Sequence, residues 1–205
     1  MPALAGQRRL EVVRSFVAID LPQTLRDRLG ELSSRLAKRV PPGSVRWVRP
    51  ESIHLTLQFL GEVSSESLSQ AEGLVRQAAD AACPFRLEIG GLGCFPNPRR
   101  PRVLWVGVRE ASGTLAALQE ALEAGFERLG YRREGRGFNP HLTLGRVRQE
   151  AGAAAAQAAG ASVANEPRPD IGEVAVDALC LFRSDLRSSG AVYTRLAEVP
   201  LRGGG

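Results

Sequence analysis

The tetrapeptide HLTL occurs twice in this chain, within the segments SIHLTLQFLG (52–61) and PHLTLGR (140–146). Each copy begins with a histidine, and these two residues, His54 and His141, are the only histidines among the 205 residues. Both copies lie in strand-like sequence. The repetition indicates a weak internal duplication, so the two copies are expected in equivalent strands of two similar lobes.

Strand-like and helix-like segments alternate along the chain. Strands are predicted over residues 14–19, 45–48, 53–60, 85–89, 103–108, 138–147, 174–182 and 191–199. Helices are predicted over residues 22–39, 64–82 and 112–129, with Ser64 or Ser65 capping the second. A Gly/Pro/Arg-rich turn is predicted over 90–101, an alanine-rich helix or mobile loop over 151–164, and a frayed tail over 202–205.

This order of segments predicts an α+β fold. Two pseudo-symmetric lobes are expected, each an antiparallel sheet with helices outside, and the lobes are expected to face each other across a central cleft. We expect one domain that spans residues 1–205 and is made of these two intertwined lobes.

Strand geometry sorts the residues of each tetrapeptide onto two faces. Side chains alternate along a strand, so the histidine and the threonine share one face and both leucines point the other way. At a rise of ~3.3 Å per residue the His and Thr Cβ atoms lie roughly 7 Å apart, which suits contact with one small tetrahedral group. If a pseudo-twofold axis relates the lobes, the two imidazoles flank one substrate atom.

Two imidazoles around one phosphorus suit the opening of a cyclic phosphodiester. Water must lose a proton as it attacks phosphorus, and the departing ribose oxygen must gain one. An imidazole with an ordinary pKa of ~6.5 can serve either step near neutral pH. We predict His54 and His141 as this pair, with Thr56 and Thr143 as hydroxyl donors and Arg146 adding positive charge. Spacing alone leaves open which imidazole is the acid.

Other kinds of site are weaker interpretations of the same residues. A metal site would need three protein ligands, whereas each tetrapeptide offers one and carboxylates nearby are sparse, so no metal is expected. No G-x-S-x-G motif is present, and no cysteine neighbours either histidine. Cys83, Cys94 and Cys180 form no C-x-x-C pair, and each is expected to be a small buried apolar residue.

The charge of the chain favours polyanionic partners. The net charge is +5, and Lys38 is the only lysine, so nearly all positive charge is arginine. Guanidinium groups suit bidentate phosphate contacts, although arginine-rich composition can equally reflect genomic base composition. A nucleotidyl-transfer ligase is disfavoured, because Lys38 has no matching motif around it. No apolar run approaches the ~20 residues that span a bilayer, and residues 1–9 do not resemble a signal peptide, so we expect a cytoplasmic protein without a membrane partner.

The residues around both tetrapeptides resemble the 2H phosphoesterase superfamily, named for paired His-x-Ser/Thr motifs. The resemblance is greatest to the bacterial and archaeal RNA 2′,3′-cyclic phosphodiesterases, historically called 2′-5′ RNA ligases, and it covers nearly the whole chain. It rests on RSFVAIDLP (14–22), RWV (46–48), SIHLTLQFLG (52–61), RVLWVGV (102–108), PHLTLGR (140–146) and LFRSDL (181–186) with Gly190 and Tyr193. A lone motif is weak evidence, whereas the ordered set is specific.

The resemblance implies hydrolysis of a terminal 2′,3′-cyclic phosphate to a 2′-phosphate without a metal or a cofactor. It assigns His54 as the general acid that protonates the departing 3′ oxygen and His141 as the general base that activates water. The same site is expected to allow the reverse reaction, in which a cyclic end joins a 5′-hydroxyl through a 2′-5′ bond.

The resemblance also implies roles for four further residues. Thr56 and Thr143 are expected to hold the phosphate, with Arg146 beside them. Phe59 matches a position that can contact the terminal nucleobase. A period-two count instead puts Phe59 on the leucine face, so core packing is the local alternative.

RNA with 2′,3′-cyclic phosphate ends, including tRNA fragments, is the expected substrate of a monomeric enzyme. Two alternatives stay open: a phosphodiesterase of a small cyclic nucleotide metabolite, and a protein that binds RNA ends without turnover. Arginine clusters at 99, 100 and 102 and at 132, 133 and 136 favour a polymer if they rim the cleft. Ordinary solvated turns are the alternative interpretation of both clusters.

Overall fold

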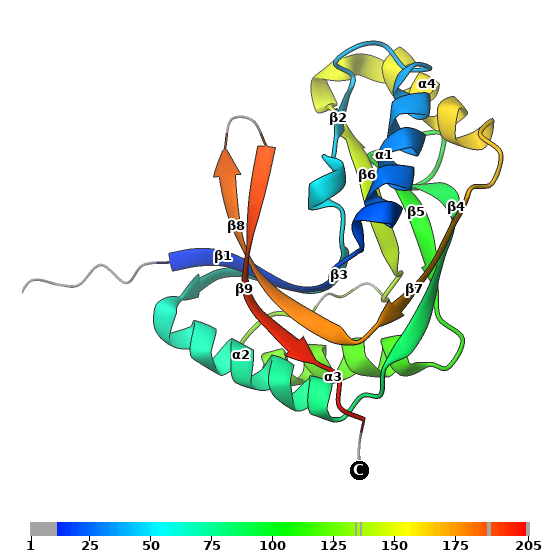
Figure 1. Ribbon diagram of the computed structural model, residues 1–205. Helices are drawn as coiled ribbons and strands as arrows, with labels where there is room; N and C mark the ends of the chain where they lie inside the picture. Colours follow the sequence, from blue (N-terminus) through cyan, green and yellow to red (C-terminus); the bar gives the residue numbers. More distant parts are fainter. Residues whose placement is uncertain (1–11, 134, 136, 188–189, 204–205) are drawn as a thin grey trace, which may run out of the picture.

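A computed structural model describes residues 12–133, 135, 137–187 and 190–203. The described strands form one nine-stranded sheet with antiparallel pairing, ordered β7-β4-β5-β6-β3-β1-β8-β9, with β2 added beside β6. The strands are β1 (Val12–Ile19), β2 (Val45–Trp47), β3 (Leu55–Ser64), β4 (Phe85–Phe95), β5 (Val103–Arg109), β6 (His141–Val147), β7 (Asp170–Val176), β8 (Ala178–Arg187) and β9 (Gly190–Pro200). The sheet is curled, and its strands form the two predicted lobes (Figure 1).

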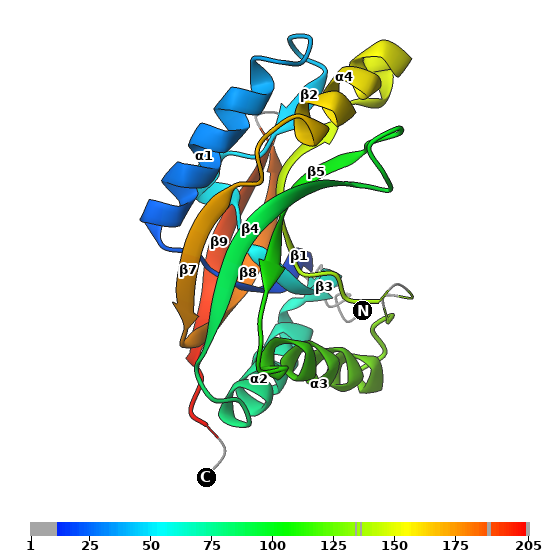
Figure 2. The same ribbon diagram turned by 90° about the vertical axis from the view of Figure 1, so that its right-hand side faces the viewer.

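Four α-helices and two short 3₁₀ turns complete the described part of the chain. They are α1 (Gln23–Ala37), η1 (Pro50–Ser52), α2 (Ser65–Asp80), α3 (Thr114–Arg128), η2 (Gln149–Ala151) and α4 (Gly152–Ala164). Figures 1 and 2 place α1 and α4 at one end of the molecule and α2 beside α3 at the other. Although α1 follows β1 along the chain, it contacts β6 and β7, while α3 follows β5 and contacts α2 and β3. Each lobe is therefore covered partly by a helix that follows a strand of the other.

The helices follow from local sequence. The predicted stripe of α1 is buried in full, with Leu25, Leu29, Leu32 and Leu36 all in the main hydrophobic cluster. Ser64 caps α2 by accepting a hydrogen bond from the Ser67 backbone N–H, which satisfies one of the free donors at the helix start. The alanine-rich segment 152–164 is helix rather than loop.

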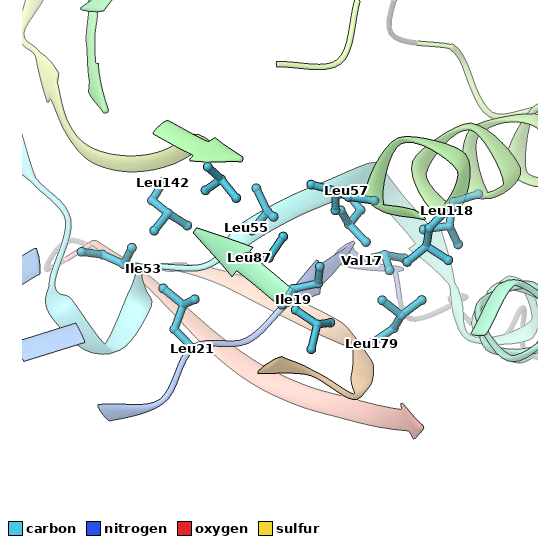
Figure 3. Close-up of a cluster of buried hydrophobic side chains, with 14 of the residues drawn as sticks. Val17, Ile19, Leu21, Ile53, Leu55, Leu57, Leu87, Leu118, Leu142 and Leu179 are labelled. Atoms are coloured by element: carbon cyan, nitrogen blue, oxygen red, sulfur yellow. The ribbon is translucent and has the colours of Figure 1, made fainter. Parts of the chain in front are cut away.

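The two tetrapeptide strands are direct neighbours at the centre of the sheet. Leu55 of β3 and Leu142 of β6 are antiparallel partners, and both are almost fully buried. Figure 3 shows them side by side among the core side chains, with Leu57 further along β3. The lobes are thus joined through these strands, and the second residues of the two tetrapeptides form the junction.

Three expectations from the sequence are wrong. The predicted turn at 90–101 is strand as far as Phe95, because a positive φ of 72° at Gly91 allows a bulge that keeps β4 paired with β5. The predicted strand 174–182 is two strands, since residues before Asp177 pair with β4 and residues after it pair with β1. Cys83 is exposed in the loop after α2, unlike Cys94 and Cys180, which are buried as expected.

Candidate active site

The four polar residues of the tetrapeptides share one face of the central strands. His54, Thr56, His141 and Thr143 are partly exposed, whereas the leucine after each of them is buried. Because β3 and β6 run antiparallel and pair at the leucines between, His54 lies toward Thr143 and His141 lies toward Thr56. The predicted alternation holds within both tetrapeptides, and the structure brings both His-x-Thr pairs together.

Aromatic side chains surround the His54 ring. The ring stacks on Phe16 of β1, with centroids 4.6 Å apart, and meets the edge of Tyr193 of β9 at 5.1 Å. Phe182 of β8 stacks behind Phe16, with centroids 5.3 Å apart. Three strands therefore hold His54 in a largely apolar setting.

His141 has a different aromatic neighbourhood, on the β4–β5 hairpin. Phe95 approaches the His141 ring edge-on at 5.0 Å, and Trp105 lies 6.4 Å away between ring centroids. Trp105 is the ladder partner of Thr143. A Cβ at Gly93 would lie 2.3 Å from a ring carbon of Trp105, so glycine is required beneath the indole.

Both imidazoles are oriented by the same local hydrogen bond. The Nδ1 atom of His54 lies 2.9 Å from the carbonyl oxygen of Ser52, and the Nδ1 atom of His141 lies 2.7 Å from that of Asn139. A carbonyl oxygen only accepts, so Nδ1 carries a proton in each ring. In the neutral ring, Nε2 then carries the free lone pair, and in the imidazolium Nε2 carries the second proton, which it can donate.

Burial lowers the pKa of His54 from 6.5 to about 4. The Ser52 carbonyl and the Asp20 carboxylate act in the opposite direction, while the Arg26 guanidinium adds to the lowering. Asp20 itself forms ion pairs with Arg26 and Arg195, which reduces the amount by which its charge raises the pKa of His54. His54 is therefore neutral at pH 7 in the free protein.

Phe59 lies on the histidine face, which contradicts the period-two count. Across β1 and β3, Phe16 pairs with Phe59 and Ala18 pairs with Thr56. Three residue steps along β3 therefore match two along β1, and Leu57 is the extra residue of a β-bulge. The bulge reverses the side-chain alternation, and Phe59 is 54% exposed, with its ring 6.1 Å from that of Phe16. Core packing, the local alternative, is therefore excluded.

A second bulge brings Arg146 to the same face. Trp105 pairs with Thr143 while Val103 pairs with Arg146, so β6 gains one residue at Leu144. Trp105 and Val103 share a face of β5, and their partners therefore share a face of β6. Arg146 is exposed, and its charge acts on Tyr193, whose pKa is raised by burial and lowered in part by Arg146. The charge of a residue on β6 in one lobe thus influences the pKa of a residue on β9 in the other lobe.

The two predicted arginine clusters differ. Arg99 and Arg100 are exposed in the turn between β4 and β5, where both backbone N–H groups donate to the Asn97 side chain. This turn belongs to the hairpin that carries the aromatic neighbours of His141. In the second cluster Arg133 pairs with Glu120 on α3, and residue 136 lies outside the described residues.

Two kinds of feature are absent from the described part of the chain. No group of three or more histidine, cysteine, aspartate or glutamate side chains there could hold a metal ion. None of the helices in these ranges is long and apolar enough to cross a membrane. Residues 1–9, expected not to be a signal peptide, lie outside the described residues.

Sequence reasoning missed most of the aromatic residues around the histidines. The predicted strands and turn contain Phe16, Tyr193, Phe95 and Trp105, but no sequence pattern marks these residues as neighbours of a histidine. The burial pattern of β5 shows that Trp105 faces away from the core while its neighbours are buried. In an all-apolar strand such as VLWVGV no polar residue marks the outer face, so the sequence could not show this.

A curled antiparallel sheet with two His-x-Thr pairs on adjacent central strands defines the class of 2H phosphoesterases. Residues 21–187 match the family model of the 2′-5′ RNA ligase superfamily, and the chain belongs to that superfamily.

Relatives of known name and structure agree with this family. A protein of Methanothermobacter thermautotrophicus named RNA 2′,3′-cyclic phosphodiesterase is 36% identical over 89% of this chain and 95% of its own length. One of the same name from Thermus thermophilus is 36% identical over 93% of this chain and 91% of its own. The crystal structure of Escherichia coli LigT complexed with 3′-AMP has a TM-score of 0.74 and 31% identity, and covers 93% of this chain and 99% of LigT.

Proposed function

We propose that this chain is an RNA 2′,3′-cyclic phosphodiesterase that hydrolyses a terminal 2′,3′-cyclic phosphate to a 2′-phosphate. The observation that carries the proposal is the gathering of both histidines and both threonines on one face around the Leu55–Leu142 pair. The names of the relatives supply the substrate class.

Both histidines act in one displacement at phosphorus. His141 Nε2 takes a proton from the attacking water, whose oxygen forms the new P–O bond. The bond from phosphorus to the 3′ oxygen breaks, and His54 Nε2–H protonates that oxygen. Both imidazoles present Nε2 to the substrate, because each Nδ1 donates to a backbone carbonyl. The assignment of acid and base comes from the family resemblance.

The acid role places a condition on His54. With a pKa of about 4 in the free protein, the imidazole must gain its proton when substrate binds. An anionic phosphodiester beside the ring favours the charged form and raises the pKa of His54, as an opposite charge within a few ångströms does. Substrate binding thus activates the acid.

The other residues bind the substrate around this centre. Thr56 and Thr143 donate hydroxyl hydrogen bonds to the non-bridging oxygens, and Arg146 balances their charge. Phe59, exposed on the same face, stacks on the terminal nucleobase. The enzyme acts as one monomeric domain in the cytoplasm on RNA ends such as those of tRNA fragments, and catalyses 2′-5′ ligation as the reverse reaction.

Product mapping tests the proposal. An RNA that ends in a 2′,3′-cyclic phosphate is incubated with the protein in the presence of a chelator, and the terminal nucleotide of the product is compared by chromatography with 2′-phosphate and 3′-phosphate standards. We expect a 2′-phosphate from the native protein, and a loss of turnover of about 10²–10⁴-fold in His54→Ala and in His141→Ala. A 3′-phosphate product, a metal requirement, or near-normal turnover in either variant would contradict the mechanism.

A further inference from the structure

Arg46 of β2 lies directly opposite Arg146 of β6. The two residues are antiparallel ladder partners, and both are exposed. Side chains in such a pair have Cβ atoms roughly 5 Å apart, and like charges at this position are destabilising. A strand of only three residues that opposes arginine with arginine gains nothing in stability from that pair.

The Arg46 side chain projects on the same face as the catalytic pairs. Its strand neighbours, Val45 and Trp47, pack into the hydrophobic clusters, so Arg46 between them points the opposite way. Its partner Arg146 shares a face with Thr143 because of the bulge at Leu144. The two guanidinium groups therefore extend the site beyond Thr143 and His54, along β6 and onto β2.

Several arginines of the described residues are held by carboxylates, whereas Arg46 and Arg146, like the exposed Arg168, are not. Among the described residues Arg195 is paired with Asp20, and Arg35 and Arg39 are paired with Glu166. No ion pair to a described carboxylate is formed by Arg46 or by Arg146. The favourable counter-charge for this pair is then an anion from outside the chain.

We propose that Arg46 binds the internucleotide phosphate immediately 5′ of the terminal nucleotide, while Arg146 serves the cyclic phosphate. At ~3.3 Å per residue, the five-residue step from His141 to Arg146 spans at most ~16 Å, so long guanidinium side chains and the imidazole can contact successive phosphates of one strand. This inference rests on the proposed function and adds to it a preference for an oligonucleotide over a cyclic mononucleotide.

The test combines one variant with one change in the substrate. The substrates are 2′,3′-cyclic CMP, a dinucleotide with a 2′,3′-cyclic end, and the same dinucleotide with a neutral methylphosphonate in place of its internucleotide phosphate. In the native protein we expect kcat/KM for the phosphate dinucleotide to exceed that for the methylphosphonate about tenfold or more, the usual value of a hydrogen bond to a charged group. In Arg46→Ala this ratio falls to near one, and the effect on cyclic CMP is at least tenfold smaller than on the dinucleotide.

The control is Arg168→Ala, which removes an exposed guanidinium from the segment before β7, three strands away from β6. It should keep the native preference, which separates a local contact from a general effect of charge. Melting curves of both variants report whether β2 still packs. Arg46→Lys should restore part of the preference.

Two results would overturn the inference. One is an equal loss on all three substrates in Arg46→Ala, which would place Arg46 at the scissile phosphate or in the fold. The other is an unchanged preference for the phosphate dinucleotide. Failure of the proposed function looks different, because the native protein would then hydrolyse none of the three. Calorimetric binding of the dinucleotide 2′-phosphate and its methylphosphonate analogue to native protein and Arg46→Ala then decides the inference without turnover.

Discussion

Phe59 of β3 and Arg146 of β6 occupy equivalent positions in the two tetrapeptide strands. Each lies five residues after its histidine and two residues after the extra residue of a β-bulge. Because the strands are antiparallel, the two side chains flank the His-x-Thr pairs at opposite ends. The same β-bulge therefore follows the histidine in both strands. It places an aromatic ring at one end of the site and a guanidinium group at the other.

Replacing Phe59 should affect binding and leave stability almost unchanged. Its side chain is 54% exposed, so Phe59→Ala should change the free energy of unfolding by only about 0.5 kcal/mol. Loss of stacking on a nucleobase, worth ~1–3 kcal/mol, should raise KM for a cyclic-ended RNA about 5- to 150-fold. Steady-state kinetics and urea unfolding check both parts, with Phe59→Tyr as the conservative control. A large loss of stability with a normal KM would show that Phe59 packs in the core and does not contact the substrate.

Replacing Arg146 should slow the reaction without unfolding the protein. The residue is exposed, and its loss also relieves the repulsion with Arg46, so Arg146→Ala should keep the native melting temperature. The lost hydrogen bond to a charged phosphate should lower kcat/KM about 10- to 100-fold. Arg146→Lys should recover only part of this, because ammonium lacks the bidentate geometry. A native value of kcat/KM in Arg146→Ala would show that Arg146 does not bind the substrate phosphate.

The low pKa of His54 makes stability depend on pH. Between about pH 6.5 and 4 the unfolded chain binds a proton on this residue and the folded chain does not, so the free energy of unfolding decreases as the pH falls through this range. The decrease reaches about 3 kcal/mol at pH 4, and it should be missing from His54→Gln. Urea unfolding of both proteins at pH 7, 5.5 and 4 measures the difference. Equal pH dependence in the two proteins would show that His54 titrates normally.

Gly145 should be required for the pairing of β2 with β6. A Cβ there would lie 2.8 Å from Cγ1 of Val45 and 3.1 Å from Cε3 of Trp47. We expect Gly145→Ala to lower the free energy of unfolding by about 1–3 kcal/mol through overpacking. Thermal unfolding measures the change. The matched control is Gly73→Ala in α2, where nothing lies within 4 Å and alanine should instead stabilise the helix by about 0.5–1 kcal/mol. A neutral result for Gly145→Ala would mean that β2 shifts freely to accommodate the methyl group.

Features that depend on neighbouring residues could be predicted from the amino-acid sequence. Alternation over four residues is a local property of a strand, so the histidine face and the leucine face of each tetrapeptide were predictable. The stripe of α1 and the Ser64 cap follow from helical spacing and cap chemistry in the same way.

Features that depend on partners distant in sequence could not be predicted and required the three-dimensional fold. A bulge exists only relative to the strand it faces, so the positions of Phe59 and Arg146 came from β1 and β5 rather than from their own strands. The low pKa of His54 came from burial against Phe16 and Tyr193, residues 38 positions before it and 139 after it. The two histidines were visible in the sequence, but their common site required the pairing of β3 with β6, which is a contact between the two halves of the chain.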